Sequence, residues 1–135
     1  MKTIRILGIE SSCDETSVSI VEKKPNNSIK VLSNIVKSQT NIHESYGGVV
    51  PELAARAHSD VIDKLIVMAL EKAKTSLKGI TAIAATAGPG LLGGLLVGVV
   101  AGKTLARYLN KPFIAVNHLE GHALSIKLEK DIDFP

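Results

Sequence analysis

Residues 117–124 read NHLEGHAL and place two histidines four positions apart. On a helix, residues four apart project from the same face, so His118 and His122 can present two imidazole nitrogens to one metal ion. A zinc or iron site usually needs a third protein ligand, and His43 and His58 have no spacing that adds them to the pair. The spacing therefore leaves two interpretations open. The histidines are either part of a metal site or two ordinary histidines.

The glutamate between these histidines tests whether the pair belongs to a peptidase. In peptidases of the His-Glu-x-x-His type, the glutamate adjoins the first histidine and acts as the base for a metal-bound water. Glu120 instead lies two residues from both His118 and His122, and at about 100° per residue a helix turns it to the opposite side. The pattern therefore disfavours a metallopeptidase.

A second group of reactive side chains lies near the N-terminus, where residues 10–16 read ESSCDET. This segment follows an apolar run and concentrates carboxylates and hydroxyls. Its candidates for facing a substrate or a nucleotide are Glu10, Ser11, Ser12 and Asp14. The alternative is that these polar residues only make a turn between two strands.

Glycines recur every four residues at Gly90, Gly94, Gly98 and Gly102. A glycine inside a helix costs about 1 kcal/mol relative to alanine, so the repeat needs a compensating role. A row of glycines lets another backbone approach closely. For Gly94, Gly98 and Gly102 we consider packing within the chain and an interface for a helix of a partner protein, and the sequence does not separate the two.

The hydrophobic pattern predicts eight elements that position these residues. The first three are strands joined by short links, with Asn26 and Asn27 forming a turn between the second and the third. A polar loop over residues 39–50 leads to Pro51, which suits the first turn of a helix. The predicted strands cover residues 4–9, 17–21, 29–36, 80–86 and 113–116, and the predicted helices cover residues 51–77, residues 91–110 and a segment that starts near residue 118.

The resulting order, βββαβαβα, predicts an α/β fold with a mixed sheet, because strands joined by helical crossovers run parallel. This is the order of the ribonuclease-H-like half-domain of actin-like ATPases, the ASKHA fold. In that architecture two halves close around a nucleotide, and the hairpin between the first two strands faces its phosphates. We therefore expect residues 1–135 to be one N-terminal half-domain, truncated at Pro135 so that the second half is absent.

The composition is that of a soluble globular domain, with 45% hydrophobic and 21% charged residues. The 16 basic and 13 acidic residues are spread along the chain, so an RNA partner is allowed but no basic arm signals one. Cys13 is the only cysteine and the N-terminus lacks a signal-peptide layout, so we expect a cytoplasmic protein. Residues 80–102 carry no charge, but the Gly-Pro-Gly at residues 88–90 interrupts them, and we expect no membrane span.

Four stretches together resemble the TsaD/Gcp (Kae/OSGEP-type) family of tRNA threonylcarbamoyladenosine synthesis proteins, once called O-sialoglycoprotein endopeptidases. They read LGIESSCDETSVSIVE, HESYGGVVPELAARAH, TAGPGLLGGLLVG and VNHLEGHAL. The resemblance covers nearly the whole chain and corresponds to the N-terminal half of the family's fold. It implies transfer of a threonylcarbamoyl group from threonylcarbamoyl-adenylate to N6 of adenosine 37, in tRNAs that read codons starting with A.

The same resemblance implies that His118 and His122 are two ligands of one divalent ion, iron or zinc. The third protein ligand, an aspartate, would lie in the second half of the family's fold, outside this chain. The ion would act as a Lewis acid on the substrate oxygens, so no side-chain nucleophile is required and we assign no catalytic residue. Because the family's Ser-Gly-Gly-His motif is also absent, we expect the isolated residues 1–135 to be inactive.

The resemblance also implies three partners, which are tRNA, the paralogue TsaB and the ATPase TsaE, with TsaB bound through helices of the N-terminal half. Two alternatives have other functions. A metal-dependent O-sialoglycoprotein endopeptidase is what the older family name asserts, although the position of Glu120 disfavours it. A non-catalytic TsaB-like protein would share the fold, but it is not expected to carry the His-x-Glu-Gly-His pattern that ends at His122.

Overall fold

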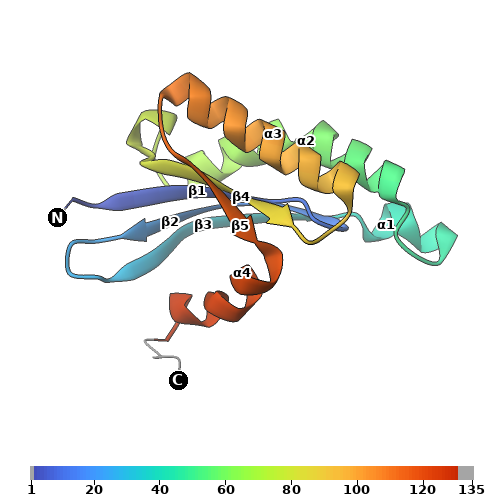
Figure 1. The fold of residues 1–135 in the computed structure, drawn as a ribbon, viewed down its shortest axis with the longest axis horizontal. Helices are drawn as coiled ribbons and strands as arrows, with labels where there is room; N and C mark the ends of the chain where they lie inside the picture. Colours follow the sequence, from blue (N-terminus) through green and yellow to red (C-terminus); the bar gives the residue numbers. More distant parts are fainter. Residues whose placement is uncertain (1, 131–135) are drawn as a thin grey trace.

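A five-stranded sheet with the order β3-β2-β1-β4-β5 forms the centre of the molecule (Figure 1). The structure is a computed structural model that describes residues 2–130. The first three strands pair antiparallel, and the last two run parallel to the first. The strands are β1 (Ile4–Glu10), β2 (Glu15–Lys23), β3 (Ile29–Ser38), β4 (Ala82–Gly88) and β5 (Phe113–Asn117). The predicted mixed sheet is confirmed. The expectation of a chain truncated at Pro135 lies outside the described residues.

Side chains of the central strands alternate between two faces, and each face has its own character. In β2 the buried positions are Thr16, Val18, Ile20 and Glu22, and the residues between them are half-buried. Successive residues of a strand point to opposite faces, so Leu7 and Ile9 of β1 share the apolar face while Gly8 and Glu10 share the other. One face therefore carries the core, and the other carries small and polar residues where β1 ends.

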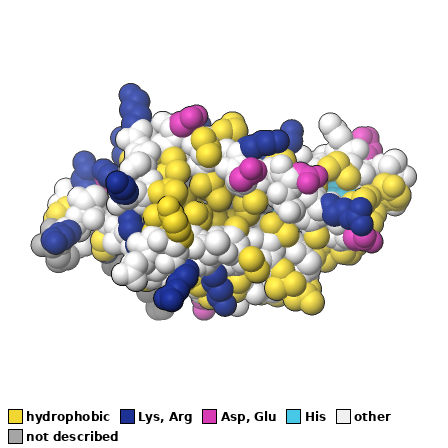
Figure 2. Space-filling view, turned by 90° about the horizontal axis from the view of Figure 1, so that it is seen from above, with side chains coloured by type: hydrophobic (Ala, Val, Ile, Leu, Met, Phe, Trp, Pro, Cys, Tyr) yellow, Lys and Arg dark blue, Asp and Glu magenta, His cyan; other side chains and the backbone are white. Residues whose placement is uncertain are grey.

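Two long helices cover the apolar face of the sheet, and a short helix lies below the opposite face (Figure 1). The covering helices are α2 (Pro51–Lys72) and α3 (Leu92–Leu109), which contact each other and the central strands. The short helix is α4 (His118–Leu124), and it continues into the 3₁₀ turn Ser125–Leu128. The outer surface of the covering helices gathers hydrophobic side chains among charged ones (Figure 2).

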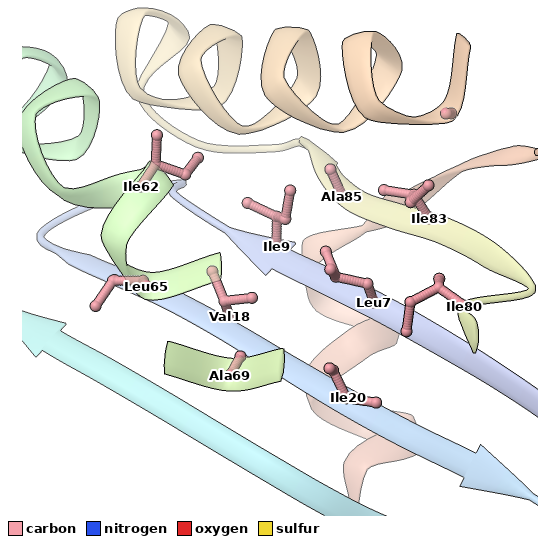
Figure 3. Close-up of a cluster of buried hydrophobic side chains, with 11 residues drawn as sticks. Leu7, Ile9, Val18, Ile20, Ile62, Leu65, Ala69, Ile80, Ile83 and Ala85 are labelled. Atoms are coloured by element: carbon pink, nitrogen blue, oxygen red, sulfur yellow. The ribbon is translucent and has the colours of Figure 1, made fainter. Parts of the chain in front are cut away.

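The hydrophobic core lies between the sheet and the two long helices, as Figure 3 shows. It takes side chains from three strands, from the link before β4 and from the inner faces of α2 and α3. Its members are Leu7, Ile9, Val18, Ile20, Ile62, Leu65, Ala69, Ile80, Ile83, Ala85 and Ala106. Burying a side chain of the size of leucine or isoleucine contributes about 1.5–3 kcal/mol, so this layer supplies most of the energy that holds the helices on the sheet.

Several boundaries differ from the sequence prediction, and one predicted loop contains a short helix. The helix that starts at Pro51 ends at Lys72, not at residue 77, because Lys74 has a left-handed φ of 50° and the chain then makes the 3₁₀ turn Leu77–Gly79. The following strand starts at Ala82, not at residue 80. The predicted polar loop over residues 39–50 contains a short helix, α1 (Thr40–His43), followed by a 3₁₀ turn, Glu44–Tyr46. Short turns of this kind leave no periodic pattern in the sequence.

Within residues 2–130, α3 is the one helix that is long and apolar enough to cross a membrane by length and composition alone. In the structure it packs on β4, β1 and α2. The inner side of α3 is lined by Gly94, Gly98 and Gly102, which bring it close to the sheet.

Candidate metal and ligand site

The candidate site lies where the three parallel strands end. Glu10 is the last residue of β1, Thr86 is close to the end of β4, and His118 directly follows β5. The carboxyl ends of parallel strands meet at one edge of a sheet, which is where open α/β sheets bind their ligands. The structure thus brings residues more than 100 positions apart into contact, with His118 beside Glu10.

The two histidines of α4 direct the same ring nitrogen toward each other. Asn117 caps the helix, because its Oδ1 accepts hydrogen bonds from the backbone N–H groups of Leu119 (2.9 Å) and Glu120 (3.2 Å). The Nε2 atoms of His118 and His122 lie 3.1 Å apart, and their rings meet edge to face at 88°. Two nitrogens bound to one tetrahedral ion at about 2.0–2.1 Å would lie roughly 3.3 Å apart, so the pair fits a shared zinc or iron ion.

A third ligand for such an ion does not come from the part of the chain that the structure describes. No group of three or more His, Cys, Asp or Glu side chains there could hold a metal ion. Glu120 is exposed in the first turn of α4, and its backbone N–H is bound by the cap of Asn117. Glu120 is not among the described residues that line the pocket beside His118 and His122, which agrees with a place on the opposite side of the helix.

The second ring nitrogen of His118 contacts the end of β1. Its Nδ1 lies 3.3 Å from Glu10 Oε2 and 3.2 Å from the hydroxyl of Ser12. The Glu10 carboxylate also accepts hydrogen bonds from the backbone N–H of Ser12 (2.5 Å) and from the hydroxyl of Thr86 (2.5 Å). Partial burial would raise the pKa of the Glu10 carboxyl, but the hydrogen bonds from Ser12, Thr86 and His118 outweigh it and hold that pKa below its usual value.

A pocket of about 290 Å³ joins the N-terminal loop to the histidine pair. Its lining is formed by Glu10, Ser12, Cys13, Asp14, Glu15, His118 and His122. Three carboxylates and two imidazoles surround this space, and no lysine or arginine lines it. Such a lining suits a cation, because a bare anion would be repelled by the carboxylates.

The four residues predicted to face a substrate do not all do so. Ser12 and Asp14 line the pocket, and Glu10 lines it while its carboxylate is bound to protein groups. Ser11 is buried and turned toward α3, where its hydroxyl donates to the carbonyl of Gly94 (2.7 Å) and accepts from the N–H of Gly98 (3.0 Å). Strand alternation explains the difference, because Ser11 follows Glu10 and points to the other face.

The glycines of α3 pack within the chain and do not form a partner surface. A Cβ built on Gly94 would lie 2.5 Å from the carbonyl oxygen of Ser11, and one on Gly98 would lie 2.4 Å from its hydroxyl. A Cβ on Gly102 would lie 2.8 Å from the ring of Phe113. Of the two interpretations of the glycine repeat, intramolecular packing is the one that the structure supports. The prediction of a partner interface at Gly94, Gly98 and Gly102 was wrong, because these residues face inward.

A buried histidine that sequence reasoning left without a role supports the same loop from α2. The ring of His58 is fully buried, and its Nε2–H donates to the carbonyl of Cys13 (3.0 Å). Its Nδ1 accepts from the hydroxyl of Thr16 (2.7 Å) and lies 3.2 Å from Gln39 Nε2. Burial keeps the pKa of His58 below its usual value of 6.5. The helical spacing of His58 with Ala54 and Ile62 on the buried face was the available signal.

Cys13 lies in this loop and is exposed. Desolvation and the negative charge of the adjacent Asp14 raise the pKa of its thiol. A raised pKa keeps the thiol protonated near neutral pH, so Cys13 is not an activated nucleophile.

Comparison with known proteins shows the family to which the chain belongs. Residues 30–135 match the family model described as "TsaD: tRNA N6-adenosine threonylcarbamoyltransferase". The chain belongs to the TsaD family. A protein of Bartonella tribocorum named tRNA N6-adenosine threonylcarbamoyltransferase is 58% identical over 132 residues, and one of Rhizobium etli with the same name is 55% identical. Each alignment covers 98% of this chain and 36% of the relative, so the chain spans about a third of the length of these TsaD proteins.

Solved structures show the same fold at low sequence identity. YeaZ from Pseudomonas aeruginosa superposes with a TM-score of 0.67 at 21% identity, covering 93% of this chain and 49% of YeaZ. RuvC of T. thermophilus, solved with a Holliday junction substrate, superposes with a TM-score of 0.55 at 14% identity, covering 92% of this chain and 73% of RuvC. These likenesses confirm the ribonuclease-H-like, actin-like half-domain predicted from the order of elements.

Proposed function

We propose that a protein carrying this chain is a tRNA N6-adenosine threonylcarbamoyltransferase, acting in the cytoplasm on adenosine 37 of tRNAs that read codons starting with A. The observation that carries the proposal is the histidine pair of α4, whose Nε2 atoms lie 3.1 Å apart beside the loop after β1, in a chain of the TsaD family. The relatives named for this activity are two to three times longer, because this chain matches 36% of their length.

The residues present fit one divalent ion, iron or zinc. His118 and His122 would hold it through their Nε2 atoms, with an aspartate from beyond this chain as the remaining protein ligand. The carboxylates around the pocket favour a cation there. When bound, the ion supplies Lewis-acid chemistry to the substrate oxygens.

In the reaction that we propose, N6 of adenosine attacks the carbonyl carbon of the threonylcarbamoyl group of threonylcarbamoyl-adenylate. A C–N bond forms, the C–O bond to the phosphate breaks, adenylate leaves and N6 loses a proton. No side chain of this chain needs to act as a nucleophile, in agreement with the raised pKa of Cys13. Ser12 and Asp14 would contact the substrate from the pocket wall, and Ser11 and His58 would hold their loop in place.

The test is the threonylcarbamoyladenosine content of bulk tRNA, measured by nucleoside mass spectrometry in cells depleted of the full-length protein. We expect the modified nucleoside to fall on depletion and to return with the wild-type gene. It should not return with a gene that carries His118→Ala and His122→Ala. A level that never falls on depletion would refute the proposed function, and residues 1–135 alone should not support transfer.

The outer surface of α2 and α3 is the surface that we propose for TsaB. Figure 2 shows hydrophobic side chains on this face, and α2 and α3 expose six large apolar side chains. They are Val67, Met68, Leu92, Leu96, Val100 and Tyr108, and Leu92 and Tyr108 are 73% and 82% exposed. A partner that buries such a patch removes apolar area from water, which stabilises the complex. tRNA and the ATPase TsaE are the other partners that we propose.

The partner surface can be separated from the glycines on the inner side of α3. Leu96→Glu changes an exposed side chain and should leave the fold intact while weakening the complex with TsaB in analytical ultracentrifugation. Lys30→Glu on β3, which is far from this patch in sequence and on the exposed edge strand, is the matched control and should leave the complex unchanged. Equal affinity for TsaB in the wild type and in Leu96→Glu would exclude this surface.

A further inference from the structure

The contact between Glu10 and His118 joins the end of β1 to the start of α4. An ionised carboxylate only accepts hydrogen bonds, so its contact with an imidazole nitrogen is favourable only when that nitrogen carries the proton. Glu10 Oε2 lies 3.3 Å from His118 Nδ1, and the hydroxyl of Ser12, which can also accept, lies 3.2 Å from the same nitrogen. The geometry selects the tautomer of His118 that is protonated at Nδ1.

The ionised form of Glu10 is itself held by protein groups. Its Oε1 accepts from the backbone N–H of Ser12 at 2.5 Å, and its Oε2 accepts from the hydroxyl of Thr86 at 2.5 Å. Both donors belong to structured elements, since Thr86 is buried in β4 and Ser12 is buried in the loop that α3 covers. The Glu10 carboxylate is therefore held in place as a hydrogen-bond acceptor for protein groups.

A proton on Nδ1 leaves the Nε2 atom of His118 with a free lone pair. That atom is the one that lies 3.1 Å from Nε2 of His122. In proteins that bind transition metals, a ligating histidine commonly donates its other N–H to a carboxylate, which fixes the ring and makes the ligating nitrogen more basic. The three groups Glu10, His118 and His122 lie in the order that such an arrangement requires.

We infer that Glu10 is a positioning residue of the metal site, which orients His118 and fixes it as the Nδ1–H tautomer, so that Nε2 can bind a divalent transition-metal ion together with His122. The inference rests on the proposed function for the presence of the ion. It assigns Glu10 a role different from the contact with substrate expected of it from the sequence, because its oxygens are bound to Ser12, Thr86 and His118.

The decisive variant is Glu10→Gln in the full-length protein. The glutamine has the same shape, and its carbonyl oxygen can still accept from the N–H of Ser12, but its NH₂ group then faces His118 and favours the opposite tautomer. The matched control is Glu15→Gln, which removes the same charge from the wall of the same pocket. A milder variant is Thr86→Val. It keeps the charge of Glu10 and removes the hydrogen bond that the Thr86 hydroxyl donates to the carboxylate.

The first readout is the affinity for Zn²⁺, measured by competition with a chelating dye. Loss of an outer partner of a metal ligand typically lowers metal affinity about 10–100-fold, and we expect a loss of that size for Glu10→Gln. Thr86→Val and Glu15→Gln should each show a smaller loss, because neither removes the carboxylate that contacts His118. Equal losses for Glu10→Gln and Glu15→Gln would mean that the charge alone acts, and they would overturn the inference, as would a wild-type protein that binds no Zn²⁺.

The second readout needs no metal and no substrate. Nitrogen NMR of metal-free protein labelled with ¹⁵N in histidine reports which ring nitrogen carries the proton, and His118→Asn identifies the signal. We expect Nδ1–H in the wild type and Nε2–H in Glu10→Gln, whereas Nε2–H in the wild type would overturn the inference. Circular dichroism confirms that each variant folds. If both readouts are as expected but depletion of the protein leaves tRNA modification unchanged, the proposed function fails and the role of Glu10 stands. If the protein is required for tRNA modification but His118 has the other tautomer, only the role of Glu10 is refuted.

Discussion

The two faces of the sheet differ in the role of the side chains that the same strands contribute to each. On the face below α2 and α3, β1 contributes Leu7 and Ile9 to a closed apolar core. On the other face, β1 contributes Gly8 and Glu10, which line open pockets near α4. Adjacent residues of one strand thus serve stability and chemistry separately. A substitution on the first face should change folding, and one on the second face should change binding.

The largest effect that we expect tests the core on the first face. Ile20→Ala removes a fully buried side chain and should lower the free energy of unfolding by about 2–5 kcal/mol, measured by urea denaturation. The matched change on the second face is Ile114→Ala, where the side chain is 44% exposed, and it should cost well under half as much. Similar losses of unfolding free energy in the two variants would contradict the claim that the core face contributes more to stability.

A smaller effect separates the glycines of the two faces. Gly98→Ala would place its Cβ 2.4 Å from the hydroxyl of Ser11, so overpacking should cost about 1–3 kcal/mol in spite of the better helix propensity of alanine. In α4 a Cβ on Gly121 would have its nearest neighbour at 3.9 Å. Gly121→Ala should therefore be neutral or stabilise the protein, by up to about 1 kcal/mol in thermal unfolding. A stabilised Gly98→Ala would contradict the packing of α3 on the loop.

The smallest effect is a dependence of stability on pH through His58. Its pKa is lowered in the folded state, so the unfolded chain binds more protons as the pH falls through 6.5. The stabilisation from neutral His58 is thus present above pH 6.5 and is lost as the pH falls through the folded-state pKa. We expect the difference in unfolding free energy between the wild type and His58→Gln to shrink between pH 7.5 and pH 5.5. A difference that grows over this range would refute a buried neutral His58.

The sequence predicted the elements well where the pattern is long and periodic. The strands of β1, β2 and β3 and the helices α2 and α3 follow from alternation and helical spacing, and Pro51 begins α2 as predicted. The end of α2 and the short helix α1 were missed, because a left-handed φ at Lys74 and a single turn at Thr40–His43 leave no periodic signal.

For the site, spacing predicted the pair but not its surroundings. His118 and His122 were predicted to share a helix face, and the structure directs both Nε2 atoms to one point. The hydrogen bond of Ser11 to Gly94 of α3 and the contact of Glu10 with His118 join residues 83 and 108 positions apart, which local patterns do not report. The helical repeat of glycines carried two interpretations because close packing inside a chain and between chains requires the same small residues.

Anomalous diffraction from the full-length protein, at the zinc or iron absorption edge, shows directly whether His118 and His122 share a metal ion. We expect one ion about 2.0–2.1 Å from Nε2 of both His118 and His122, with Nδ1 of His118 turned to Glu10. An ion bound elsewhere, or bound through Nδ1 of His118, would contradict this expectation.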